Sequence, residues 1–110
     1  MTIHLIRQRA SSEQVAEMLA TLTTYIKVAV DLEQEILAGG GEMHADCEQV
    51  LLDNGSQQAV IWGADWNPEE QEVTFESLIN IRPSQNNRSM EIQDPAIRTQ
   101  VERIVRRCFE

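Results

Sequence analysis

Apolar residues recur every three or four positions over the first third of the chain, which is the spacing of one face of a helix. Before them, the alternating stretch IHLIR at residues 3–7 predicts a short strand. Ser11 and Gln14 have the spacing of a capping box, in which two side chains satisfy the free backbone donors of a new helix. We therefore predict helix from residue 12 to residue 38, either unbroken or divided into two at the threonines of residues 21–25.

The dipeptide Asn54-Gly55 lies between two largely apolar stretches and is the clearest turn signal in the chain. Asn-Gly favours a two-residue β-hairpin turn, because both central residues of that turn have positive φ angles. The sequence therefore predicts two paired strands, residues 43–53 and 56–66, whose register is fixed by the turn.

A third alternating stretch at residues 73–82 predicts another strand, which completes a three-stranded meander. Asp94-Pro95 then predicts the start of a last helix, with a side-chain cap and a proline where no amide donor is needed. We predict an α+β fold: an antiparallel sheet, made of the meander and the N-terminal strand, that is covered on one face by helices. The expected core positions of the sheet are Cys47, Val60, Trp62, Phe75 and Ile79.

The composition is that of a soluble globular protein, with 42% hydrophobic and 25% charged residues, and residues 1–110 suit a single domain. No apolar run approaches the roughly 18 residues that a membrane helix needs, and the first ten residues lack a signal-peptide core. We therefore expect a cytoplasmic protein without a membrane partner. Cys47 and Cys108 lack metal-binding spacing and are expected to be reduced and buried. No cofactor is predicted.

The net charge of −9 is unevenly distributed. Residues 1–80 hold 14 acidic and three basic side chains, whereas residues 81–110 hold four acidic and six basic ones. An excess of negative charge repels the phosphate backbone of nucleic acids. Nucleic-acid binding is therefore disfavoured unless the six arginines of the last part gather on one face.

Three long stretches of the sequence are particular enough to suggest a family: ILAGGGEMHADCE, DNGSQQAVIWGADW and ESLINIRPSQNNRSMEIQDPAIR. Together they resemble an uncharacterised bacterial family, frequent in cyanobacteria, that is known as a domain of unknown function. The resemblance spans nearly the whole chain. It implies no activity, ligand or catalytic residue.

Polar side chains gather on one face at the glycine end of the predicted hairpin. They are Glu42, His44, Asp46, Asp65 and Glu76, and the predicted register places His44 opposite Asp65. One histidine with two or three carboxylates could hold a divalent metal ion, and the three preceding glycines would let a ligand approach the backbone. The same alternation is typical of any sheet with one face in water. We therefore predict a solvated His44–Asp65 pair and no high-affinity metal site.

The loop RPSQNNRS after the predicted third strand is rich in hydrogen-bond donors. Its candidate anion-binding residues are Arg82, Asn86, Asn87, Arg88 and Ser89, which could together hold a phosphate or carboxylate group. Asn and Ser are equally typical of turns. Anion binding here requires that the two arginines converge.

Two classes of function follow. The first is a non-catalytic module that binds a ligand or another protein, with a homo-oligomer formed through Trp62, Trp66 or a helix face as one form of it. The second is a small hydrolase or nuclease acting on a phosphate-containing substrate, with acids from the sheet and arginines from the loop. The predicted order of elements is similar to that of the ribosome-dependent RNase toxins, but those proteins are usually basic. The sequence contains no nucleophile elbow, phosphate-binding glycine loop or H-E-x-x-H motif.

Overall fold

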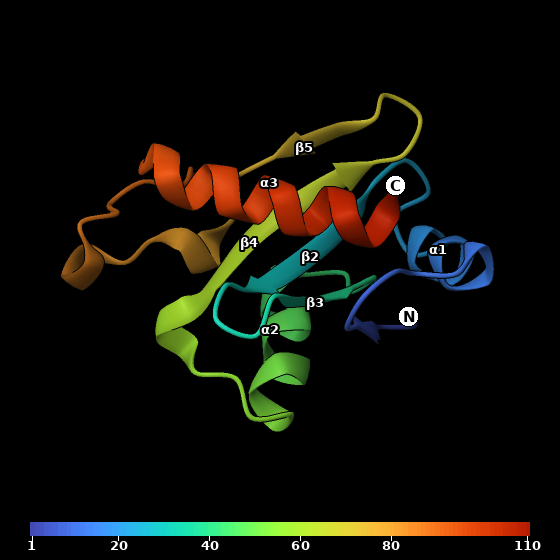
Figure 1. The fold of residues 1–110 in the computed structure, drawn as a ribbon, viewed down its shortest axis with the longest axis horizontal. Helices are drawn as coiled ribbons and strands as arrows, with labels where there is room; N and C mark the ends of the chain where they lie inside the picture. The colour runs from blue at the N-terminus through green and yellow to red at the C-terminus, as the bar shows by residue number, and fades with distance from the viewer.

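The computed structural model describes all residues from 1 to 110 and contains one five-stranded antiparallel sheet flanked by helices (Figure 1). In chain order the elements are β1 (His4–Ile6), α1 (Ser12–Leu19), β2 (Ile26–Asp31), β3 (Ile36–Gly39), α2 (His44–Asp53), η1 (Gln58–Val60), β4 (Ile61–Asn67), β5 (Glu72–Thr74), η2 (Leu78–Asn80), η3 (Pro83–Gln85) and α3 (Pro95–Phe109), where η marks a short 3₁₀ helix. The strands lie in the order β1-β3-β2-β4-β5. The predicted α+β class is confirmed. None of the helices has the length and apolar character needed to cross a bilayer.

Both predicted helix starts are confirmed, because the signals act over a few neighbouring residues. The Ser11 hydroxyl accepts the Gln14 N–H at 3.1 Å, and the Gln14 side chain accepts the Ser11 N–H at 3.0 Å. The carboxylate of Asp94 accepts the Ala96 N–H at 2.8 Å, with Pro95 in the first turn of α3. The N-terminal strand is also present as β1.

The prediction of helix up to residue 38 is wrong beyond Leu19. Residues 26–39 form a hairpin of β2 and β3 instead. Its turn is set by Asp31, whose Oδ1 accepts the backbone N–H groups of Glu33 at 2.8 Å and Gln34 at 2.9 Å. Strand β2 is central and nearly all of it is buried, so its sequence shows no clean two-residue alternation.

The predicted hairpin around Asn54-Gly55 is also wrong. Residues 44–53 form α2, Asn54 is the C-cap of this helix, and Gly55 follows with φ +93°. A glycine with positive φ ends helices as readily as it makes hairpin turns. Strand β4 therefore pairs with β2 and β5, and Trp62 lies opposite Val30 rather than opposite Cys47.

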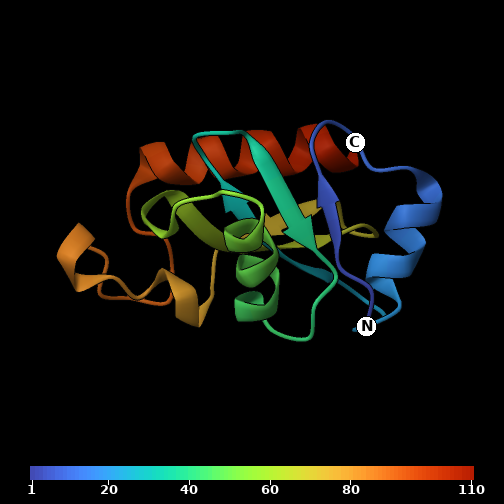
Figure 2. The ribbon, with the colours of Figure 1, turned by 90° about the horizontal axis from the view of Figure 1, so that it is seen from below.

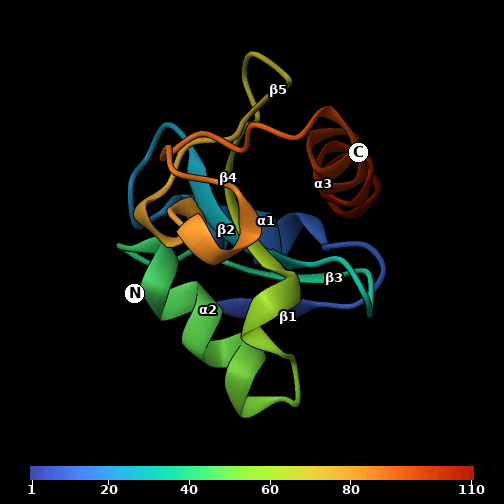
Figure 3. The same cartoon turned by 90° about the vertical axis from the view of Figure 1, so that its left-hand side faces the viewer.

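The third strand of the predicted meander is shorter than expected. It ends at Thr74, Glu76 forms a single bridge with Glu91, and the chain then turns into η2. The helices also cover both faces of the sheet rather than one. Figures 2 and 3 show α2 and α3 on opposite sides of the strands.

The core has two parts, one on each side of the sheet. On the α3 side, Trp62 and Trp66 are 2% and 1% exposed, and Trp66 stacks on Phe109 with the ring centres 5.8 Å apart. These two tryptophans are core residues in this chain, so they cannot anchor an interface as predicted. On the α2 side, Cys47 and Leu51 pack against Ala29, Ala38 and Ile61. Of the predicted core positions, Cys47, Trp62 and Phe75 are buried, whereas Val60 and Ile79 are half-buried.

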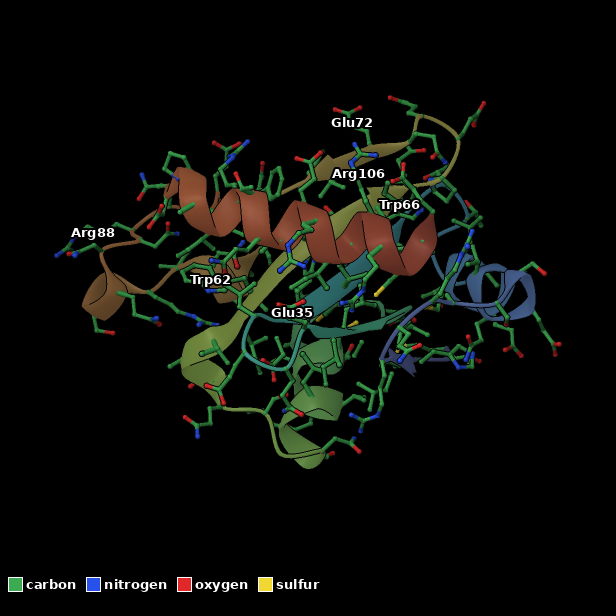
Figure 4. The ribbon with its side chains drawn as sticks, in the orientation of Figure 1. Glu35, Trp62, Trp66, Glu72, Arg88 and Arg106 are labelled. Atoms are coloured by element: carbon green, nitrogen blue, oxygen red, sulfur yellow. The ribbon has the colours of Figure 1, made fainter.

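Contacts between α3 and the β2–β3 turn fix the helix over the sheet. Glu35 lies in this turn beside α3 (Figure 4), and its carboxylate accepts hydrogen bonds from Arg103 at 3.1 Å. Arg107 contacts the same carboxylate at 3.4 Å. The arginines of α3 are thus used within the molecule.

Candidate functional site

A cleft of about 570 Å³ opens on the α2 side of the sheet, between the first turn of α2 and η2. Helix α2 packs mainly on β2 and β3 on this side, whereas Asp65 of β4 and Thr74 of β5 line the cleft. The cleft is lined by polar side chains from the sheet and by apolar ones from its two walls: Tyr25, Lys27, Met43, His44, Ala45, Asp65, Thr74, Glu76, Ser77, Leu78, Ile79 and Met90. Three of the five polar candidates predicted from the sequence, His44, Asp65 and Glu76, are among them.

His44 and Asp65 form a fixed pair in this cleft. The Nε2 atom of His44 lies 2.9 Å from Asp65 Oδ1 and 3.0 Å from the carbonyl oxygen of Ala64. Both are acceptors, so the neutral ring that satisfies them carries its proton on Nε2. Thr74 donates its hydroxyl hydrogen to the other oxygen of Asp65 at 3.3 Å. The predicted proximity of His44 and Asp65 is confirmed, but His44 is 8% exposed rather than solvated.

The route by which His44 reaches Asp65 differs from the predicted one. His44 is the first residue of α2, so it contacts β4 from a helix on the face of the sheet and not from a neighbouring strand. Buried Cys47 and Leu51 hold α2 against the sheet. Gly40 makes the turn into this helix: its φ is +104°, and a Cβ there would lie 2.4 Å from the Thr2 carbonyl oxygen. This glycine therefore serves close chain packing rather than approach of a ligand.

The charges at the cleft are mainly negative. Lys27 lies opposite Asp65 in the β2–β4 ladder, but its ammonium group donates to the carbonyl oxygen of Glu42 at 3.0 Å. The exposed carboxylate of Glu76 has no hydrogen-bond or ion-pair partner. A cation entering the cleft would meet the free carboxylate of Glu76 and the carboxylate of Asp65. The carboxylate of Asp65 is contacted only by neutral groups and by a histidine.

The other two polar candidates lie outside the cleft. Glu42 is exposed in the loop before α2, and Asp46 is half-buried in the first turn of that helix. A carboxylate there interacts favourably with the helix dipole. No group of three or more His, Cys, Asp or Glu side chains is arranged to hold a metal ion.

The thiol of Cys47 is fully buried in the core on the α2 side of the sheet. Burial raises the pKa of Cys47 to about 11. Its Sγ lies 3.5 Å from the carbonyl oxygen of Lys27, to which it donates. Cys108 is likewise buried and free, and burial raises the pKa of its thiol.

The candidate anion loop is divided between structural and exposed side chains. Arg82 donates to the carbonyl oxygens of Ile79 at 3.0 Å and Gln58 at 2.7 Å, and its guanidinium lies 4.9 Å from the ring centre of Trp62. Figure 4 shows Arg88 at the outer end of the loop, directed away from Trp62. The structure therefore does not bring the two arginines together around one site.

Among the other candidate residues of this loop, Asn87 and Ser89 form hydrogen bonds within the molecule, whereas Asn86 is exposed. Buried Asn87 donates to the carbonyl oxygens of Asn80 at 2.8 Å, Ser89 at 2.9 Å and Glu91 at 2.9 Å. The hydroxyl of Ser89 accepts the backbone N–H of Glu91 at 3.1 Å. Asn86 is exposed, with φ +61°, as the C-cap of η3. Anion binding by the free donors that remain in this loop stays a prediction.

The sequence analysis missed the apolar part of the cleft. Met43, Leu78 and Met90 line it and are 54%, 63% and 37% exposed. They are three of only five large hydrophobic side chains that are exposed in the chain. They come from the N-cap of α2, from η2 and from the segment before α3, so no pattern along the sequence could have grouped them.

A family model described as "Protein of unknown function (DUF5674)" matches residues 4–108, and the chain belongs to this family. This confirms the resemblance to an uncharacterised domain. The comparisons with curated proteins and with solved structures found no match. The family description assigns no activity.

Proposed function

We propose that the protein is a small cytoplasmic binding module without catalytic activity, and that the cleft beside His44 and Asp65 binds an amphipathic ligand with a positively charged group. The single observation that carries this proposal is the composition of the cleft. Its volume of about 570 Å³ lies within the range of ligand sites in proteins, which is roughly 300 to 1,000 Å³. Exposed Met43, Leu78 and Met90 offer an apolar wall, and Glu76 offers a free carboxylate.

The absence of catalysis is part of the same proposal. Both oxygens of Asp65 and the Nε2 atom of His44 are engaged with each other or with neighbours. The raised pKa of Cys47, about 11, keeps this thiol protonated at neutral pH. No arginine lines the cleft, so phosphate chemistry, the alternative that we derived from the sequence, finds less support there.

A matched pair of small amphiphiles tests the proposal. The ¹H–¹⁵N spectrum of the protein is recorded during titration with hexylamine, which is positively charged at neutral pH, and separately with hexanoate. We expect hexylamine to shift the signals of His44, Thr74 and Met90 in a saturable way, with a dissociation constant that is roughly millimolar for so small a ligand. Hexanoate should bind more weakly, because its carboxylate meets Glu76 and Asp65.

Two variants locate the site. Glu76→Gln should weaken hexylamine binding and leave the fold intact, because the side chain of Glu76 is exposed and unpaired. Glu33→Gln is the matched control, since it changes another exposed carboxylate, in the turn between β2 and β3. Shifts that are unsaturable, that are spread over the surface, or that are equal for hexanoate would contradict the proposal.

A further inference from the structure

The cleft continues into a second depression over β5. This depression, of about 350 Å³, is lined by Tyr25, Asp65, Asn67, Glu70, Glu72 and Thr74. It shares Tyr25, Asp65 and Thr74 with the first cleft. The two depressions therefore adjoin across β4 and β5, and together they are called the groove, with the methionines and Leu78 at one end and the β4–β5 turn at the other. We call the two parts the apolar end and the acidic end.

The acidic end holds carboxylates that form no ion pair within the molecule, although Arg106 reaches the same turn and donates to the carbonyl oxygen of Gln71 at 3.1 Å. The side chains of Glu70 and Glu72 are exposed and have no hydrogen-bond or ion-pair partner. In α3, by contrast, Glu102 and Glu110 are each paired with Arg106, at 2.9 Å and 3.1 Å. Figure 4 shows Glu72 at the outer edge of the sheet. The unpaired carboxylates continue the negative charge of Asp65 and Glu76 along the groove.

The apolar end is lined by flexible side chains that can adapt to an apolar side chain of a ligand. Two of its three exposed apolar residues, Met43 and Met90, are methionines. Methionine is flexible and polarizable, and it is common at binding surfaces that accept varied apolar groups. Leu78, 63% exposed, would lose most of its contact with water under a bound apolar group.

We propose that the occupant of this groove is an extended basic peptide segment of another protein, with apolar side chains at the His44 end and lysine or arginine side chains over Glu70 and Glu72. This inference rests on the proposed function and names the partner. Glu72 and Glu76 are four residues apart in extended chain, which corresponds to roughly 13 Å. A segment of about five or six residues spans that distance, whereas a small amine reaches only one end.

Charge complementarity favours a basic segment of a different protein over a second copy of this chain as the occupant of the groove. Such a copy would have to supply a basic surface, but Arg103 and Arg107 are bonded to Glu35, and Arg106 is bonded to Glu102, Glu110 and the Gln71 carbonyl oxygen. The exposed arginines without a carboxylate partner, Arg7, Arg9 and Arg88, are few against the 18 acidic residues of the chain. The chain is also strongly acidic, with a net charge of −9, so two copies repel each other at long range. A basic segment on a different protein is attracted by the same field.

Fluorescence anisotropy with short labelled peptides tests the inference. The probe is a five-residue peptide with two leucines at one end and three lysines at the other. Matched peptides carry glutamate in place of lysine, serine in place of leucine, or the same residues in scrambled order. We expect only the leucine–lysine peptide to bind tightly, with affinity that falls as salt is raised.

Variants of the acidic end separate this inference from the proposed function. The double change Glu70→Gln and Glu72→Gln should weaken the peptide roughly five- to tenfold and leave hexylamine binding nearly unchanged, since hexylamine occupies the apolar end. Glu33→Gln should change neither. If hexylamine binds and the double variant holds the peptide as tightly as the wild type, the partner is wrong but the binding site stands. If neither ligand binds, both fail. Concentration-dependent dimerisation that is lost in Leu78→Ser would assign the groove to a second copy and overturn the inference.

Discussion

Asn80 joins the wall of the cleft to the sheet, and its replacement gives a sharp test of the fold around the site. The side chain has no exposed surface. Its Oδ1 accepts the backbone N–H of Gly63 at 2.8 Å, and its Nδ2 donates to the carbonyl oxygens of Gly63 at 3.0 Å, Met90 at 3.1 Å and Phe75 at 3.3 Å. Because β5 ends at Thr74, Asn80 supplies Gly63 with the partners that a longer strand would give it.

The cost of Asn80→Ala follows from these bonds. A typical hydrogen bond contributes about 1 kcal/mol net, and a buried polar group left without a partner costs about 1 to 3 kcal/mol. The change removes three to four such bonds and leaves the N–H and carbonyl of Gly63 unsatisfied beside a small cavity. Allowing for partial relaxation, we expect the free energy of unfolding to fall by about 3 to 5 kcal/mol.

Urea denaturation followed by circular dichroism measures this loss, with Gln100→Ala as the control. Gln100 is exposed on α3, and its replacement should change the free energy of unfolding by less than about 0.5 kcal/mol. Since Asn80 belongs to η2, the Asn80 variant should also lose hexylamine binding. A loss of stability below about 1 kcal/mol with an unchanged dependence on urea would refute the role of Asn80.

Three further predictions concern the turns, the surface and the thiols. Thr23 is exposed and has a φ angle of +71°, which is costly for a branched side chain. Thr23→Gly should therefore raise the free energy of unfolding by about 1 kcal/mol. A lower melting temperature of the variant in thermal melts would contradict this conformation. Hydrogen bonding and charge from Arg103 lower the pKa of Glu35 from 4.5, so their stabilisation is present above that pH and is lost as the pH falls through the lowered value. Glu35→Gln should therefore destabilise the protein at pH 7 and much less in strong acid; an equal difference at both would show that the pair does not titrate as described. Burial raises the pKa of Cys47 to about 11 and also raises the pKa of Cys108. Iodoacetamide at pH 8 should therefore label neither thiol until the protein is unfolded. Rapid labelling of the native protein, measured by mass spectrometry, would show that the thiols are accessible.

The parts of the fold that could be predicted from the sequence are those set by neighbouring residues. The capping box of Ser11 and Gln14 and the start of α3 at Asp94-Pro95 each need only three or four residues to form. Asn54-Gly55 was also a local signal, but it suits both a hairpin and the end of a helix. The spacing of Cys47 and Leu51, four residues apart and both buried, is the helical pattern that distinguishes α2.

The rest of the fold depends on what covers each strand. Strand β2 is buried on both faces because α2 and α3 lie on opposite sides of the sheet, so its apolar residues also fitted a helical spacing. The pairing of His44 with Asp65 was predicted from a register that does not exist, and the true contact joins a helix to a strand. The apolar wall of Met43, Leu78 and Met90 arises only when three distant segments meet.

Methionine methyl signals offer the most direct test of the claim that this cleft is a binding site. The chain has four methionines: Met43 and Met90 line the cleft, Met18 is fully buried, and Met1 is 70% exposed. With ¹³C-methyl-labelled methionine and increasing hexylamine, the account predicts that Met43 and Met90 shift together with one dissociation constant while Met18 stays fixed. Equal, unsaturable shifts of Met1, Met43 and Met90, or no shift at all, would contradict it.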